Sequence, residues 1–94
     1  GLGDVYKRQE VDTLSQLSQV LELKPALVLL DNFSVEETRD AVALRDELSP
    51  ATKLESSGGL SLEDAHSYGA TGVDYLAVGA LTHSVKVLDL GLDM

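Results

Sequence analysis

The chain has 94 residues, a formal net charge of −9 from 16 acidic and 7 basic side chains, 44% hydrophobic residues and no cysteine. This composition fits one small folded domain and excludes a disulfide framework, a thiolate metal site and a cysteine nucleophile. The acidity argues against nucleic acid and anionic membranes as partners. The apolar runs are far shorter than the roughly 20 residues of a membrane helix. No secretory signal is visible, so we expect a cytoplasmic protein.

The first third of the chain predicts a strand end, a helix and a buried strand. Glu10–Asp12 is interpreted as the tail of a strand, and Thr13 with Gln16 forms a capping box at a helix start. The leucines that recur at helical spacing after this cap are Leu14, Leu17 and Leu21. Pro25–Leu30 is a continuous apolar run, which is typical of a strand buried in a parallel sheet.

A second helix and another strand follow. Ser34 and Glu37 form a further capping box, and Pro50 ends this helix. Its charged side chains are interpreted as a solvated face, and they are Glu36, Glu37, Arg39, Asp40 and Arg45. Thr52–Glu55 is the next expected strand, and we expect the glycines after it to form a loop.

The last third predicts one more helix and one more strand. Ser61 with Asp64 is a weaker capping signal, and Val73–Val78 is an apolar strand that ends at a glycine. Thr82–Leu88 is expected to form a short extra helix.

This alternation indicates an α/β fold of repeated βα units with parallel strands. Four units are only half of an eight-unit barrel of about 250 residues. We therefore expect residues 10–94 to be the C-terminal part of a larger barrel. Residues 1–9 fit no unit and are interpreted as a leader outside the domain. A cloning scar or an assembly artefact explains them better than a natural loop does.

Candidate functional residues stand where the expected strands end, which is where βα folds place their sites. Glu10 and Asp31 are carboxylates suited to Mg²⁺, to sugar hydroxyls or to positive charge on a sugar carbon. Two glycine loops follow consecutive strands, and backbone amides there bind phosphate well. Their residues are Ser57, Gly58 and Gly59, and Val78, Gly79 and Ala80. Either glycine loop alone is better explained as a tight turn, and Asp31 can be a turn former beside Asn32. The occurrence of both glycine loops together favours a phosphate site.

Three segments in this order, Leu29–Ser34, Glu55–Glu63 and Gly72–Ser84, resemble the quinolinate phosphoribosyltransferases, or nicotinate-nucleotide pyrophosphorylases. Leu88–Asp93 resembles the C-terminal end of that family. The resemblance implies a small α/β sandwich followed by an incomplete (β/α) barrel of the type II phosphoribosyltransferase kind, in homodimers or multiples of dimers. It also implies transfer of phosphoribose from phosphoribosyl pyrophosphate (PRPP) to quinolinate, with Mg²⁺. The products would be nicotinate mononucleotide, pyrophosphate and CO₂, in NAD biosynthesis.

By this resemblance, Glu10 and Asp31 match the family's acids at the ribose and metal side of PRPP, and both glycine loops match its phosphate loops. His83 stands where many members have histidine, and its role is left open. The family's basic cluster for quinolinate precedes the position of Glu10 and is missing here, so we expect this chain alone to be inactive.

Two alternatives stay open on the sequence. A related phosphoribosyltransferase with another acceptor is the first, because the acceptor-binding residues are the missing ones. A non-catalytic phosphate-binding or assembly module is the second.

Overall fold

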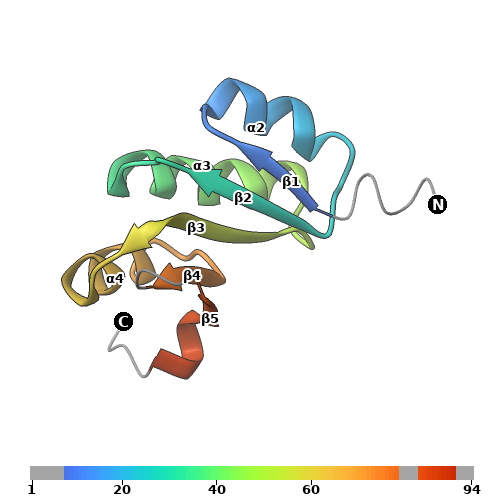
Figure 1. The fold of residues 1–94 in the computed structure, drawn as a ribbon. Helices are drawn as coiled ribbons and strands as arrows, with labels where there is room; N and C mark the ends of the chain where they lie inside the picture. Colours follow the sequence, from blue (N-terminus) through green and yellow to red (C-terminus); the bar gives the residue numbers. More distant parts are fainter. Residues whose placement is uncertain (1–7, 79–82, 91–94) are drawn as a thin grey trace.

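The computed structural model describes residues 8–78 and 83–90, and these form an α/β fold (Figure 1). The strands are β1 (Arg8–Val11), β2 (Leu27–Asp31), β3 (Lys53–Leu60), β4 (Tyr75–Val78) and β5 (His83–Lys86). The helices are α2 (Leu14–Leu21), α3 (Val35–Leu48), α4 (Leu62–Gly69) and the 3-10 helix η1 (Val87–Leu90). The predicted alternation of strands and helices is confirmed as far as β4.

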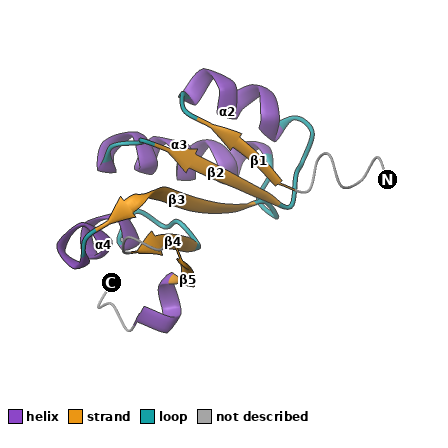
Figure 2. Ribbon diagram, viewed as in Figure 1, coloured by secondary structure: helices purple, strands orange, loops and turns teal. Residues whose placement is uncertain are grey.

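The strands form one sheet in the order β1-β2-β3-β4-β5 (Figure 2). β1 to β4 are parallel, and β5 pairs antiparallel with β4. One row of paired positions runs from Glu10 through Leu29 and Glu55 to Tyr75. Because side chains alternate along a strand, all members of this row lie on the same face of the sheet.

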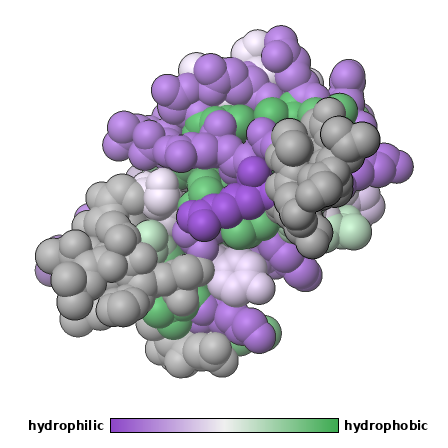
Figure 3. Space-filling view, turned by 45° about the vertical axis from the view of Figure 1, so that its right-hand side comes forward, coloured by the Kyte–Doolittle hydropathy of each residue, from purple (hydrophilic) through white to green (hydrophobic). Residues whose placement is uncertain are grey.

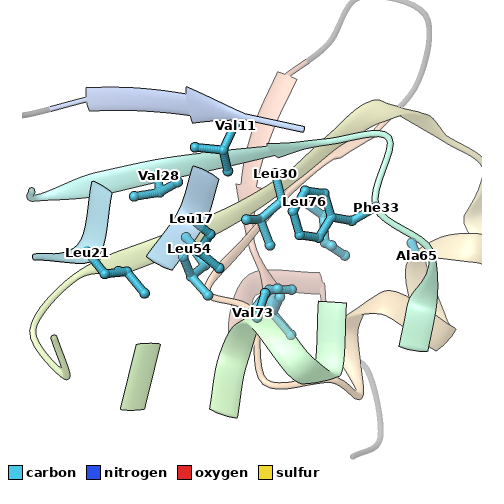
Figure 4. Close-up of a cluster of buried hydrophobic side chains, with 12 residues drawn as sticks. Val11, Leu17, Leu21, Val28, Leu30, Phe33, Leu54, Ala65, Val73 and Leu76 are labelled. Carbon is cyan, nitrogen blue, oxygen red and sulfur yellow. The ribbon is translucent and has the colours of Figure 1, made fainter. Parts of the chain in front are cut away.

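The opposite face is covered by the helices. Val28, Leu30, Leu54 and Leu76 of the strands are fully buried there, packed with Leu17 and Leu21 of α2, Ala41 of α3 and Ala65 of α4 (Figure 4). Each of these buried valine and leucine side chains contributes about 1.5–3 kcal/mol to the stability of the fold. The hydrophobic effect therefore fixes which face of each strand meets the helices, and by alternation which face holds Glu10 and Asp31.

The predicted helix caps are confirmed. The Thr13 hydroxyl accepts from the Gln16 amide at 3.1 Å, whereas the Gln16 side chain reaches one residue further back, to the amide of Asp12 at 2.9 Å. Ser34 and Glu37 make both bonds of a capping box, at 3.1 and 3.0 Å. Such a cap stabilises a helix by about 1 kcal/mol. At α4, the hydroxyl of the cap contacts its acidic partner directly.

The extra helix predicted over Thr82–Leu88 is wrong. Residues His83–Lys86 form β5, and only η1, from Val87, is helical. His83 pairs with Val78 in register, so the chain reverses direction within four residues. An antiparallel strand needs only such a short connection, whereas a parallel strand needs a crossover.

Other boundaries differ from the predictions because strand pairing extends beyond the local pattern. β1 begins at Arg8, inside the segment interpreted as a leader, because Arg8 and Gln9 pair with β2. The expected Ser57–Gly59 loop is wrong, since these residues continue β3. The solvated position expected for Arg45 is also wrong, because this residue is 7% exposed.

Hydrophilic side chains cover much of the described surface in the view of Figure 3. Within residues 8–78 and 83–90, no helix is long and apolar enough to cross a membrane. Leu88 is a large apolar side chain that is 86% exposed.

Candidate functional site

The two carboxylates predicted to act together lie beside one cavity. Glu10 is exposed near the end of β1, and Asp31 is half-buried as the last residue of β2. Both line a cavity of about 420 Å³ at the carboxyl ends of β1 and β2, and Gln16, Gln19 and Val20 of α2 line it as well. This volume lies in the range of small-molecule sites. The juxtaposition follows from the sheet, because neighbouring parallel strands end at the same edge.

Asp31 is followed by a tight, specific turn. Asn32 has φ 59°, a left-handed conformation that asparagine tolerates better than most residues. Phe33 turns back into the core and is 4% exposed, and Ser34 then caps α3. The carbonyl of Phe33 accepts a hydrogen bond of 2.6 Å from the hydroxyl of Tyr68. The backbone after Asp31 is therefore fixed at Phe33 by the Tyr68 hydroxyl and at Ser34 by the helix cap.

Tyr68 is half-buried in α4 and partly surrounded by acidic groups. Burial raises the pKa of its hydroxyl, and the carboxylates of Asp64 and Glu37 raise it further. The hydroxyl therefore stays protonated and able to donate to Phe33.

Ser57 lies beside Asp31 on the neighbouring strand. The two residues are paired in register, and the Ser57 hydroxyl makes a long contact of 3.5 Å with the carbonyl of Leu30. Ser57 thus belongs to the same end of the sheet as the carboxylates, as predicted.

Gly58 and Gly59 lie where β3 departs from regular pairing with β4. Between the pairs Ser56–Leu76 and Leu60–Val78, β3 advances four residues while β4 advances two. A bulge of this kind leaves backbone groups outside the ladder and bends the strand, and glycine suits such a position. The predicted phosphate segment is therefore an irregular strand end, followed at once by the cap of α4.

The second predicted phosphate segment is described only in part. Val78 ends β4 and pairs with both Leu60 and His83, so its backbone lies next to the end of β3. Gly79 and Ala80 lie outside the described residues.

One carboxylate on this face did not figure among the predicted site residues. Glu55 stands two positions before Ser57 in β3, in the same paired row as Glu10, and is 6% exposed. The sequence signal that could have drawn attention to it is the place of this acid within a strand expected in a parallel sheet, where both faces are usually covered.

The donor set formed by Glu10 and Asp31 fits Mg²⁺. Carboxylate oxygens are the ligands this ion favours, and it commonly takes only one or two of them, with water and substrate phosphates filling the remaining positions. Among the described residues, no group of three or more histidine, cysteine or acidic side chains is arranged to hold a metal.

Comparison with known proteins identifies the family of this chain. The family described as quinolinate phosphoribosyl transferase, C-terminal domain, matches residues 5–93. A nicotinate-nucleotide pyrophosphorylase [carboxylating] from Mycobacterium leprae is 62% identical over 85 residues, which are 90% of this chain and 30% of that protein. A probable enzyme of the same name from Methanocaldococcus jannaschii is 38% identical over 90% of this chain and 31% of its own length. The chain thus spans about 30% of the length of these relatives.

Solved structures show the same fold. The nicotinate-nucleotide pyrophosphorylase from Francisella tularensis is similar with a TM-score of 0.69 and 35% identity, over 84% of this chain and 28% of that one. The protein of that name from Ehrlichia chaffeensis gives a TM-score of 0.73 and 30% identity, over 86% and 29% of the two chains. Taken with the family match over almost its whole length, these similarities show that the chain belongs to the quinolinate phosphoribosyl transferase family and corresponds to the C-terminal portion of its barrel.

Proposed function

We propose that this chain acts as the C-terminal part of an enzyme that transfers phosphoribose from PRPP to quinolinate. Decarboxylation of the product then gives nicotinate mononucleotide for NAD biosynthesis, with release of pyrophosphate and CO₂. The observation that supports this most directly is the cavity shared by Glu10 and Asp31 at the end of the sheet. The names of the relatives supply the reaction class.

In this proposal the carboxylates act on the sugar. The bond between the anomeric carbon and the pyrophosphate oxygen breaks, and the quinolinate nitrogen bonds to that carbon. Positive charge develops on the sugar during this exchange, and fixed carboxylates lower its energy. Asp31 suits this role because its strand and the turn after it hold it in place, while Glu10 accepts hydrogen bonds from sugar hydroxyls.

The glycine-bearing segments act on phosphate. Ser57, Gly58 and Gly59 offer a hydroxyl and backbone amides, and Val78, Gly79 and Ala80 form the second arm of the proposed phosphate site. Amides bind anions without a cationic side chain, which suits a chain of net charge −9. Mg²⁺ held by Glu10 and Asp31 together with PRPP would neutralise the pyrophosphate as it leaves. We also propose a cytoplasmic homodimer or multiple of dimers as the working form.

The test is made on the full-length enzyme that contains this chain, with quinolinate, PRPP and Mg²⁺, by measuring nicotinate mononucleotide. Asp31→Ala should lower kcat/KM for PRPP by roughly a hundredfold or more. Asp40→Ala, an exposed acid on α3, is the matched control and should behave as the unchanged enzyme.

Competition between quinolinate and other nitrogenous acceptors then tests acceptor choice. Preference for another acceptor would indicate a related phosphoribosyltransferase. An unchanged Asp31→Ala enzyme would contradict the proposed site, and absence of turnover in the unchanged full-length protein would favour a binding or assembly module.

A further inference from the structure

The hydrogen bond from Tyr68 to Phe33 joins two segments that are 35 residues apart in the chain. Tyr68 lies one helical turn after Ala65, on the side of α4 that faces the core, and its ring packs partly against that core. The acceptor is the backbone carbonyl of Phe33, so the bond holds the main chain of the turn after β2. Its length of 2.6 Å is short even for a hydroxyl donor.

The turn held in this way is very short. Only Asn32 and Phe33 stand between Asp31, the last residue of β2, and Ser34, the cap of α3. Asn32 already occupies a left-handed conformation, which most residues avoid. Few backbone dihedral angles separate the Phe33 carbonyl from Asp31. A displacement of that carbonyl should therefore also displace Asp31.

The donor of this hydrogen bond, Tyr68, lies in the helix that follows the proposed phosphate segment. α4 starts directly after β3, with Ser61 as its cap, so the helix follows the irregular segment of Ser57, Gly58 and Gly59. Tyr68 thus connects the helix after the proposed phosphate segment to the turn after the proposed sugar-binding carboxylate.

We propose that Tyr68 is a positioning residue, whose hydroxyl holds the Asp31 turn against α4 so that the carboxylate and the phosphate segment fit one PRPP molecule. This inference rests on the proposed function. It adds a residue that touches neither substrate nor metal but sets the relative position of the groups that do.

The experiment compares three variants of the full-length enzyme. Tyr68→Phe removes the hydroxyl and keeps the ring in the core. Thr71→Val is the matched control, because its hydroxyl donates to the Tyr68 carbonyl at 2.5 Å within the end of α4 and makes no contact with the Asp31 turn. Asp31→Ala reports on the proposed function itself. For each variant, kcat and the KM values for PRPP and for quinolinate are measured.

We expect Tyr68→Phe to raise the KM for PRPP by roughly five- to tenfold, with kcat and the KM for quinolinate unchanged. Thr71→Val should leave both KM values unchanged. A purely structural role would instead lower the active fraction of the enzyme, and so the apparent kcat, while both KM values stay unchanged.

The outcomes separate the two claims. If Asp31→Ala is inactive but Tyr68→Phe has the kinetics of the unchanged enzyme, the positioning role is wrong and the proposed function stands. Equal loss of kcat in Tyr68→Phe and Thr71→Val, with unchanged KM for PRPP, also overturns the positioning role. A fully active Asp31→Ala enzyme overturns the proposed function and the inference with it.

Discussion

Arg45 in α3 and Asp74 just before β4 form an ion pair of 2.8 Å, although 29 residues separate them in the chain. The same guanidinium group donates to the carbonyl of Thr52 at 2.7 Å, and the same carboxylate oxygen accepts from the amide of Leu54 at 2.9 Å. The end of α3 is therefore tied to the beginnings of β3 and β4, at the opposite end of the sheet from Asp31.

This ion pair predicts a large effect for one substitution. Arg45→Met should lower the free energy of unfolding by roughly 2–3 kcal/mol, because it leaves Asp74 without its cation. The Asp74 side chain is 27% exposed, so the loss should be smaller than for a fully buried pair. Urea unfolding of the protein measures it, with Arg39→Met on the exposed side of the same helix as the control. Equal losses in both variants would contradict the structural role of the pair.

Gly72 is the second position where a small change should be costly. Its φ of +101° suits glycine alone, and an added Cβ would stand 3.0 Å from Cγ1 of Val42. Gly72→Ala should therefore destabilise the protein by roughly 2 kcal/mol. Combining it with Val42→Ala should recover the part of the lost stability that comes from the clash with Val42. The part that comes from the positive φ should remain. A double-mutant cycle by urea unfolding, with Val42→Ala as the reference, tests this, and strictly additive losses would show that the contact is irrelevant.

The stability of the protein should fall at alkaline pH because of Tyr68. Burial and the carboxylates of Asp64 and Glu37 raise its pKa in the folded state above the value of about 10 in an unfolded chain. The folded state then binds the proton more tightly, so this contribution is complete below about pH 10 and is lost as pH rises through the folded pKa. Urea midpoints above pH 10 should decline less in Tyr68→Phe than in the unchanged protein. An equal decline in Tyr68→Phe and in the unchanged protein would show that Tyr68 is not the group responsible.

The chain by itself should form no detectable nicotinate mononucleotide from quinolinate and PRPP. Its described site provides carboxylates and a phosphate segment, and the resemblance implies that the cations for quinolinate come from elsewhere in a longer protein. The assay uses the purified 94-residue chain at high concentration, beside the full-length enzyme as a positive control. Turnover by the purified chain would show that the acceptor site does not need those residues.

Local sequence signals were sufficient to place Asp31 at the end of a strand. Asp31 directly follows a continuous apolar strand and precedes a helix cap, so its place at a strand end could be predicted. Ser34 was equally clear, because a capping box is formed by residues only three positions apart. These features depend on neighbours in the chain, which a sequence displays directly.

Features that depend on distant partners were missed. Arg45 lies among charged residues of an amphipathic helix, and no neighbouring residue in the chain indicates its ion pair with Asp74. The bulge in β3 arises from its register against β4, and β5 arises from pairing with β4, so neither is encoded by a local period. The sequence around Tyr68 gives no sign that its hydroxyl donates to the Phe33 carbonyl, 35 residues earlier in the chain.

The antiparallel direction of β5 has a consequence for how a barrel can be completed from this sheet. β5 ends the parallel series on one side, so β1 is the edge at which another parallel strand can join. Such a strand would bring its carboxyl end beside Glu10, and the loop after it would overlook the cavity shared with Asp31. If the proposed function holds, the outer side of β1 is thus the place where a longer enzyme would add the side chains that choose the acceptor, next to the proposed sugar site.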